Sequence, residues 1–307
     1  MKQSLQGSKN IVDKYQIMFI CTGEIGIPFF ESLSHDNRFT ISKIITKNDL
    51  NTKRSSFYQY CMQNGHMVEV PKSPTEIQGL GKVDAAVVIS YGHKIPNNLL
   101  AMTKWVNIHG SILPQFRGAS PIQYAISAGL EVTGLTATIM TSKMDAGPVI
   151  ATHEVLIRPD DNFKALADRM GSTGGPWFAD TLYRFLKGEI VPYEQNADFA
   201  SYAPVISEEF RHIHWDDATH VHNRVRALSP YNYAKSRIND FEVKIVKTKV
   251  LEVNSPGVSG ELVDAKRLII QCARGLIEIE QLIPPNSKLM TGSEFLTGLT
   301  NKKKKSS

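Results

Sequence analysis

The chain has 307 residues, of which 42% are hydrophobic and 21% charged, and its formal net charge is +5. This is the composition of an ordinary globular protein with one large or two smaller domains, and its charge is too small to identify a nucleic-acid partner. Three widely spaced cysteines argue against a disulfide framework or a zinc site, and no apolar run approaches the roughly 18 residues needed to span a bilayer.

Residues 1–15 form a polar N-terminal extension without the hydrophobic centre of a secretory signal. After it, short apolar runs alternate with helical patterns. We expect strands at 16–20, 39–46, 66–70 and 84–90, and helices around 29–33 and over 55–64. This alternation predicts an α/β fold, a doubly wound and mostly parallel sheet with helices on both faces. Gly23 and Gly26 lack the G-x-G-x-x-G spacing, so we interpret them as leaving room for a ligand or a helix end at the sheet edge.

Three polar residues lie at the ends of apolar segments in the middle of the chain: Asn107, His109 and Asp145. An amide can stabilise a developing oxyanion, an imidazole can move a proton, and a carboxylate can orient that imidazole. Alternation along an extended strand sends Asn107 and His109 to the same side, where both could reach one reacting atom. An Asn-x-His pair on a strand is more often structural than catalytic, so this assignment depends on its context.

The helical pattern over 162–187 contains Gly171, Gly174, Gly175 and Pro176, which predict two helices or one kinked helix. A polar, Pro-interrupted linker follows at 190–205. Beyond it we expect a helix over 218–228 and then short strands with period-two alternation, which favour a small open β-barrel, OB-like, over 206–299. Thr291-x-x-Glu294 is a capping box that begins a last short helix, and residues 300–307 form a basic tail.

The residues around the three polar positions form a specific combination. Ser111-Ile112-Leu113-Pro114 follows His109, Arg117 opens the run RGASPIQ, and Asp145-Ala146-Gly147 closes a Thr-rich strand. This combination resembles the active-site signature of the folate-dependent formyltransferases, and RGASPIQ is similar to the R-G-A-A-P-I-Q of the members that act on methionyl-tRNA. The resemblance covers the chain from about residue 16 to 299 and implies a catalytic domain over 16–189 and a tRNA-binding barrel.

The resemblance implies transfer of a formyl group from 10-formyltetrahydrofolate to the amine of methionyl-initiator-tRNA for translation initiation, without a metal. Asn107 would stabilise the oxyanion, His109 would relay the proton, and Asp145 would hold the imidazole. The folate pocket would be lined by Tyr91, Gly92, Ser111, Ile112, Leu113 and Pro114, with Ser111 as a turn residue rather than a nucleophile. The tRNA would be contacted by Lys47, Lys53, Arg54, Arg117, Lys244, Lys247 and Lys249.

Two stretches depart from the family pattern. The family usually has a long, D-R-P-A-G-R-G-like insertion after the second strand that contacts the tRNA acceptor end, whereas only KNDLNTKR separates Thr46 from Ser55 here. The linker reads APVISEE from Ala203, where the family usually has A-P-K-L-S-K-E. Because phosphate contacts are lost, we expect weaker selection of initiator tRNA than in relatives with the long insertion.

Two alternatives stay open. A formyltransferase for a nucleotide sugar, a purine precursor or another small amine would share the three polar residues, although RGASPIQ and the second domain favour tRNA. A tRNA-binding protein with decayed catalysis is disfavoured because all three polar residues are present. We expect a monomer that contacts no membrane, in the bacterial cytoplasm, with an organellar location as the alternative.

Overall fold

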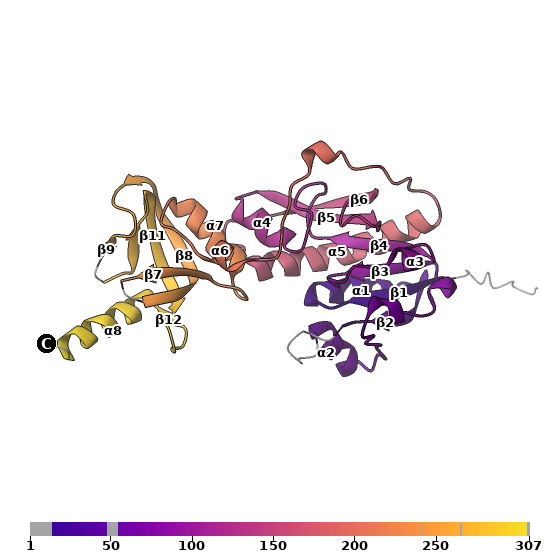
Figure 1. Ribbon diagram of the computed structural model, residues 1–307, viewed down its shortest axis with the longest axis horizontal. Helices are drawn as coiled ribbons and strands as arrows, with labels where there is room; N and C mark the ends of the chain where they lie inside the picture. Colours follow the sequence, from indigo (N-terminus) through magenta and orange to yellow (C-terminus); the bar gives the residue numbers. More distant parts are fainter. Residues whose placement is uncertain (1–13, 48–54, 240, 265, 306–307) are drawn as a thin grey trace, which may run out of the picture. The chain divides into compact units, whose positions relative to one another are not determined.

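The computed structural model describes residues 14–47, 55–239, 241–264 and 266–305, and it contains two sheets. The first sheet has the strand order β2-β1-β3-β4-β5-β6 (Figure 1). Its strands are β1 (Tyr15–Cys21), β2 (Phe39–Ile45), β3 (Ala85–Ile89), β4 (Lys104–His109), β5 (Val132–Ile139) and β6 (Val149–Leu156). The pairs β1–β2, β1–β3 and β3–β4 are parallel, and the predicted α/β sheet is confirmed.

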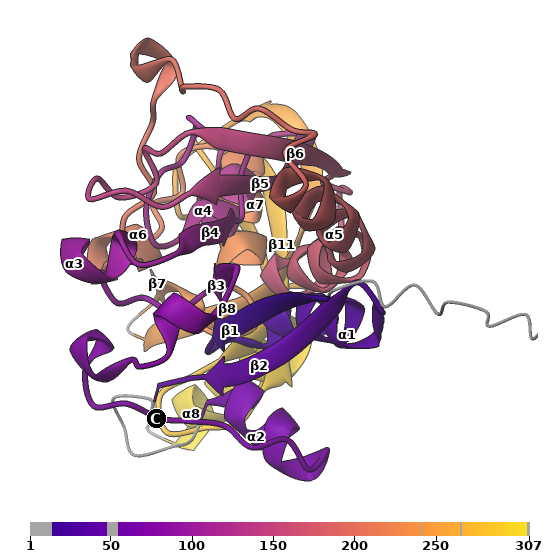
Figure 2. The same ribbon diagram turned by 90° about the vertical axis from the view of Figure 1, so that its right-hand side faces the viewer.

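Helices cover both faces of this sheet. They are η1 (Glu24–Gly26), α1 (Ile27–His35), α2 (Ser56–Gln63), η2 (Pro74–Glu76), η3 (Leu80–Lys82), α3 (Asn97–Leu100), α4 (Pro121–Ser127) and α5 (Phe163–Leu186). Helices α1 and α5 lie on one side and α3 on the other (Figure 2). Strand β1 is apolar on both faces: the ring of Phe19 packs 5.4 Å from that of Phe30 in α1, whereas Met18 belongs to the cluster that includes Leu99 of α3. A sheet buried on both faces requires such a continuous apolar run.

The strand predicted at 66–70 is wrong, and of the two alternatives predicted for 162–187 the pair of helices is wrong. Helix α5 is one continuous helix with Pro176 inside it. Its glycines serve close packing, because a Cβ at Gly175 would lie 2.6 Å from the carbonyl oxygen of Pro28. Residues 66–70 do not form a named strand; they contribute one isolated parallel bridge, between Glu69 and Ile45.

The second sheet is antiparallel, has the order β7-β8-β11-β10-β9, and carries β12 beside β11. Its strands are β7 (Ala234–Ile238), β8 (Phe241–Pro256), β9 (Leu262–Asp264), β10 (Ile269–Gln271), β11 (Arg274–Ile283) and β12 (Met290–Thr291). Helix α7 (Ala218–Leu228) has the predicted bounds and buries Val221 and Val225 in the same apolar cluster as Ile245 and Ile277. The predicted barrel-like C-terminal fold is therefore confirmed.

Capping side chains fix the ends of the helices in this part of the chain. The carboxylate of Asp217 accepts from the backbone N–H groups of Thr219 (2.9 Å) and His220 (3.0 Å) and caps α7. The capping box is confirmed, since the Thr291 N–H donates to the Glu294 carboxylate at 2.7 Å and the Glu294 N–H donates to the Thr291 hydroxyl at 3.3 Å. The helix that it begins, α8 (Gly292–Lys305), continues through most of the predicted basic tail.

By their internal contacts, the residues form two compact units that cut across the linear order of the chain. Among the described residues, one comprises 14–47, 55–108, 137–151 and 171–194, and the other comprises 109–136, 152–170, 195–239, 241–264 and 266–305. In the second unit, the ring of Tyr124 in α4 lies 4.6 Å from that of Phe210 in α6 (Glu208–Arg211). The Arg226 guanidinium of α7 donates to the carbonyl oxygen of Asp161 at 3.0 Å. In the described part of the chain, no helix is both long and apolar enough to cross a membrane.

Candidate active site

Strand β4 carries both Asn107 and His109. Asn107 pairs in register with Val88 of β3, and the neighbouring pair is Trp105 with Ala86. The Trp105 indole is buried and donates to the carbonyl oxygen of Leu99 at 2.9 Å, which anchors the start of the strand. Asn107 is half-buried and His109 is 5% exposed. The predicted strand is confirmed, so the amide and the imidazole lie two residues apart on it.

The His109 ring contacts the turn that follows β4. Its Nε2 lies 2.8 Å from the carbonyl oxygen of Phe116. Because a carbonyl oxygen can only accept, this bond places a proton on Nε2 and gives the neutral ring its lone pair on Nδ1. Phe116 has φ of +57°, in the left-handed region that costs an L-residue about 1–2 kcal/mol. Its N–H donates to the Ser201 hydroxyl at 2.9 Å, so a residue 85 positions away stabilises this conformation.

Side-chain hydrogen bonds make the turn after His109 rigid. The hydroxyl of Ser111 is buried and donates to the carbonyl oxygen of Gln115 at 2.6 Å, so Ser111 is a turn residue as predicted. The Thr136 hydroxyl donates to the carbonyl oxygen of Ser111 (2.6 Å) and accepts from the N–H of Leu113 (3.0 Å). The assignment of this turn to the folate pocket stays a prediction.

Arg117 is 9% exposed and holds the connection between α5 and α6 rather than projecting into solvent. Its Nε and Nη2 donate to the side-chain oxygen of Gln195 at 3.1 and 2.7 Å. Its backbone N–H donates to the carbonyl oxygen of Ser201 at 2.8 Å and its carbonyl oxygen accepts from Ala203 at the same distance. Gly118, at φ of +123°, admits no Cβ, which would lie 2.6 Å from the Ala203 oxygen. The predicted contact of Arg117 with tRNA stays a prediction.

Asp145 lies in the loop between β5 and β6. It is half-buried, and its φ of +51° is in the left-handed region, which Asp tolerates better than most residues. Gly147 is required two residues later, because a Cβ there would lie 1.9 Å from the carbonyl oxygen of Ile139. The N–H of Ile139 donates to the carbonyl oxygen of Pro148 at 2.9 Å and closes the loop. The loop therefore has a defined conformation that fixes where the Asp145 backbone lies.

Tyr91 and Gly92 follow β3, and the structure brings Lys47 to them. Tyr91 is 2% exposed, and its ring packs edge-on against that of His93 at 5.2 Å. A Cβ at Gly92 would lie 3.0 Å from the Lys47 ammonium. Burial and the Lys47 charge together lower the pKa of His93. Lys47 thus lies against the predicted folate-binding stretch, whereas Lys53 and Arg54 lie outside the described residues.

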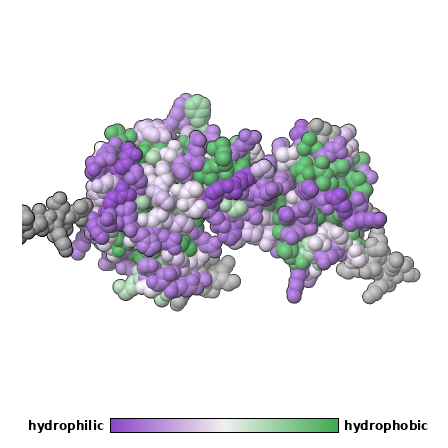
Figure 3. Space-filling view, turned by 180° about the vertical axis from the view of Figure 1, so that it is seen from behind, coloured by the Kyte–Doolittle hydropathy of each residue, from purple (hydrophilic) through white to green (hydrophobic). Residues whose placement is uncertain are grey.

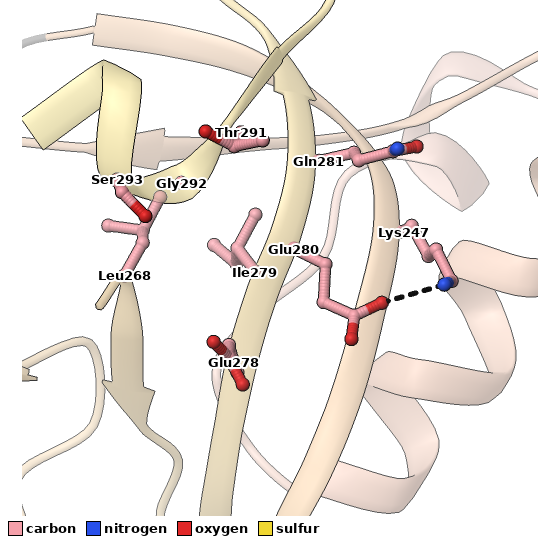
Figure 4. A pocket seen from close by; sticks show the side chains of 9 residues that line it. All are labelled: Lys247, Leu268, Glu278, Ile279, Glu280, Gln281, Thr291, Gly292 and Ser293. Atoms are coloured by element: carbon pink, nitrogen blue, oxygen red, sulfur yellow. Dashed lines mark ion pairs between the residues drawn. The ribbon is translucent and has the colours of Figure 1, made fainter.

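The three predicted tRNA-binding lysines of the barrel, Lys244, Lys247 and Lys249, all lie on β8 and are exposed. Acidic side chains of β11 share this region. Lys247 forms an ion pair with Glu280 at 3.0 Å, and both line a hollow of about 360 Å³ together with Glu278 (Figure 4). On the side seen in Figure 3, hydrophobic residues are concentrated over the barrel. The lysines are therefore not part of an uninterrupted basic stripe.

The three cysteines are free and buried, and burial raises the pKa of Cys61 to about 11 and that of Cys272 to about 12. Such thiols are poor nucleophiles near neutral pH. Among the residues that the structure describes, no three His, Cys, Asp or Glu side chains are grouped so that they could hold a metal ion.

Comparison with known sequences identifies relatives along most of the chain. Residues 58–182 match the formyl transferase family and residues 205–300 match the formyl transferase C-terminal domain. The methionyl-tRNA formyltransferase of Hydrogenobaculum sp. (strain Y04AAS1) is 31% identical over 304 residues, which cover 94% of this chain and 99% of the relative. That of Leptospira interrogans serovar Lai is 38% identical over 233 residues, 72% of each chain.

Solved structures share the fold. The N-formyltransferase from Helicobacter canadensis, in complex with folinic acid and dTDP-3-aminofucose, superposes with a TM-score of 0.67 at 18% identity, covering 87% of this chain and 98% of that one. HypX from Aquifex aeolicus, in complex with tetrahydrofolic acid, gives a TM-score of 0.63 at 20% identity; the match covers 92% of this chain but 47% of HypX, so this chain spans about half its length. From the sequence relatives, the chain belongs to the methionyl-tRNA formyltransferase family.

Proposed function

We propose that this protein transfers the formyl group of 10-formyltetrahydrofolate to the amine of methionyl-initiator-tRNA. The observation that carries the proposal is the similarity to methionyl-tRNA formyltransferases over 94% of the chain, together with Asn107 and His109 on one strand and the hydrogen bond that holds the His109 ring. Tyr91, Gly92 and the turn 111–114 would hold the folate, because they follow the carboxyl ends of the parallel strands β3 and β4, where ligands of open α/β sheets bind.

The residues of the chain suit an addition–elimination at the formyl carbon. The neutral amine of the methionyl ester attacks that carbon, a C–N bond forms, and the carbonyl oxygen becomes an oxyanion to which Asn107 donates. His109 takes the proton of the attacking amine and delivers it to the folate nitrogen as the bond from that nitrogen to the formyl carbon breaks. Asp145 stabilises the positive charge that the ring carries once it has taken this proton. Ser111 takes no part, since its hydroxyl already donates to the Gln115 carbonyl.

The barrel would supply the surface that a small-molecule acceptor does not need. We propose a catalytic domain at 16–189, a linker at 190–205 and a tRNA-binding barrel at 206–299, with Lys244, Lys247 and Lys249 among its phosphate contacts. Because Glu280 pairs with Lys247, tRNA phosphate would have to displace a carboxylate there. Counterion release predicts that the KM for tRNA rises steeply with added salt.

The test is formylation of charged initiator tRNA with 10-formyltetrahydrofolate by the full-length protein, with elongator Met-tRNA as the comparison. We expect efficient formylation of the initiator and weaker discrimination against the elongator than in relatives with the long insertion. Formylation of a nucleotide sugar without formylation of Met-tRNA would refute the proposal in favour of a small-amine enzyme. The proposed site of action is the bacterial cytoplasm.

A further inference from the structure

The connection between α5 and α6 exposes an unusual number of aromatic rings. In the described part of the chain four large aromatic side chains are exposed, and three belong to this connection: Tyr193 (56% exposed), Phe199 (69%) and Tyr202 (70%). Phe199 ends η4 (Ala197–Phe199), a single turn within the connection (Figure 1). Several exposed aromatic rings in one short segment indicate a surface that binds a ligand or a partner.

The backbone that carries Phe199 and Tyr202 is held in place. The Asn196 side chain accepts from the N–H of Asp198 at 3.0 Å and caps η4. Ser201, between the two rings, accepts from the N–H groups of Phe116 and Arg117 at 2.9 and 2.8 Å. Rings on an ordered backbone lose little conformational entropy when a ligand covers them.

The same hydrogen bonds place the segment beside the candidate catalytic turn. Tyr202 forms a parallel bridge with Arg117, and the residue before Arg117, Phe116, accepts from His109 through its carbonyl oxygen at 2.8 Å. A substrate whose reacting group reaches His109 therefore has its adjacent part within reach of this segment. In an aminoacyl-tRNA, that adjacent part is the unpaired 3′ end of the acceptor arm.

We propose that Phe199 and Tyr202 form a stacking platform for the unpaired nucleotides at the 3′ end of the charged tRNA. The inference rests on the proposed function and adds positioning residues to it. Stacking suits this end because every base presents a flat face to a ring, whatever its sequence. Acidic Glu194 and Asp198 are exposed in the same segment and would repel phosphates, so the contribution of the platform should come from ring contacts rather than from charge.

A protein partner fits this surface less well. Polar residues stand between the rings in the sequence YEQNADFASY, from Tyr193 to Tyr202, and Glu194 and Asp198 are exposed, whereas the centre of a protein interface is depleted of charged residues. Stacking requires no such centre, because each ring needs only one base. If a protein does cover this surface, it is a second copy of this chain, and the test must distinguish this copy from tRNA.

The test compares full-length variants in steady-state formylation of methionyl-initiator-tRNA. Stacking is worth about 1–3 kcal/mol per base, so Phe199→Ala with Tyr202→Ala should raise the KM for tRNA at least about fivefold, with kcat at saturating tRNA changed less than about twofold. The KM for 10-formyltetrahydrofolate should be unchanged, and the increase should be similar at low and high salt. Phe199→Tyr and Tyr202→Phe keep the rings and should keep the KM.

Val205→Ala is the matched control, since Val205 is 73% exposed in the same connection but has no ring, and it should leave the KM unchanged. A wild-type KM in the double alanine variant would overturn the platform. If that variant also loses a dimer in size-exclusion chromatography, the rings bind a second copy of this chain instead of tRNA. If the wild-type protein formylates no Met-tRNA, the proposed function fails first. Formylation by the wild type with a normal KM in the double variant refutes the platform alone.

Discussion

The hydroxyl of Ser201 is positioned to control the shape of the turn that the His109 ring contacts. It accepts from the N–H of Phe116, whose carbonyl oxygen accepts from His109. Without this acceptor, the left-handed conformation of Phe116 loses the bond that offsets its strain. The net loss of one such hydrogen bond is about 0.5–1.5 kcal/mol, and a half-buried N–H left without a partner costs roughly 1–3 kcal/mol.

A value of about 1–2 kcal/mol corresponds to a five- to thirtyfold change in the equilibrium constant between the native turn and its alternatives. Activity falls by the same factor where the native turn is no longer the major conformation. We therefore expect Ser201→Ala to lower kcat/KM for formylation by up to about thirtyfold, which can be measured with charged initiator tRNA at saturating 10-formyltetrahydrofolate. Ser201→Thr keeps the hydroxyl and should lose much less.

The matched control is Ser34→Ala, which removes a surface hydroxyl that donates to Glu31 within α1. It should leave formylation unchanged. The reasoning is refuted if folded Ser201→Ala keeps wild-type kcat/KM, or if the Ser34 variant loses as much activity as the Ser201 variant. Thermal melting of both variants separates a loosened turn from loss of the fold.

Asn107→Ala and His109→Ala should each lower turnover about 100-fold or more at unchanged folate affinity, and near-native turnover would remove that residue from the mechanism. Asp217→Ala should reduce the free energy of unfolding by about 0.5–2 kcal/mol at pH 7, measured with urea, because it removes the α7 cap. Burial raises the pKa of Asp217, but hydrogen bonds from the backbone and from Arg274 lower it more, so the folded pKa lies below the unfolded one. The carboxylate therefore stabilises the fold above the unfolded pKa, and the difference in unfolding free energy between wild type and variant should shrink as the pH falls through the folded pKa. Gly175→Ala should destabilise the protein by about 1–3 kcal/mol because of overpacking against α1, whereas Gly298→Ala, with open space around it in α8, should stabilise it; equal effects would contradict the packing role.

The elements that the sequence predicts well are those whose pattern is complete within a short window. Helix α7 combines an apolar stripe with a serine-proline stop, and it was placed at its observed bounds. Helix α5 shows where such a prediction fails. A glycine in a helical pattern predicts a break, and its role in packing becomes clear only when the residue that it packs against is known. Gly175 is needed for the approach of Pro28, which is 147 positions earlier in the chain.

The candidate site also has residues that the sequence predicts and contacts that it does not predict. Asn107, His109 and Asp145 could be selected because their types and spacing are local properties of the sequence. The contact that holds the His109 ring could not be predicted in this way. Phe116 depends on a hydrogen bond to Ser201 for its conformation, and no local pattern identifies a serine 85 positions away. The contact of Arg117 with tRNA was implied by the family resemblance and stays a prediction. The hydrogen bond of Arg117 to Gln195 becomes visible only in three dimensions.

The bonds from Gln195, Ser201 and Ala203 to the turn at 115–117 also impose an order on how a newly made chain matures. A ribosome delivers β1 to β6 long before it delivers residue 195, and the sheet of an N-terminal region can form while synthesis continues. The turn that His109 contacts is completed only when the later segment emerges and closes a loop of some eighty residues. A chain released before residue 195 would thus contain the three predicted catalytic side chains but not the contacts that fix the histidine's neighbour. Maturation of the site is in this sense a late event of translation, timed by the position of one short segment.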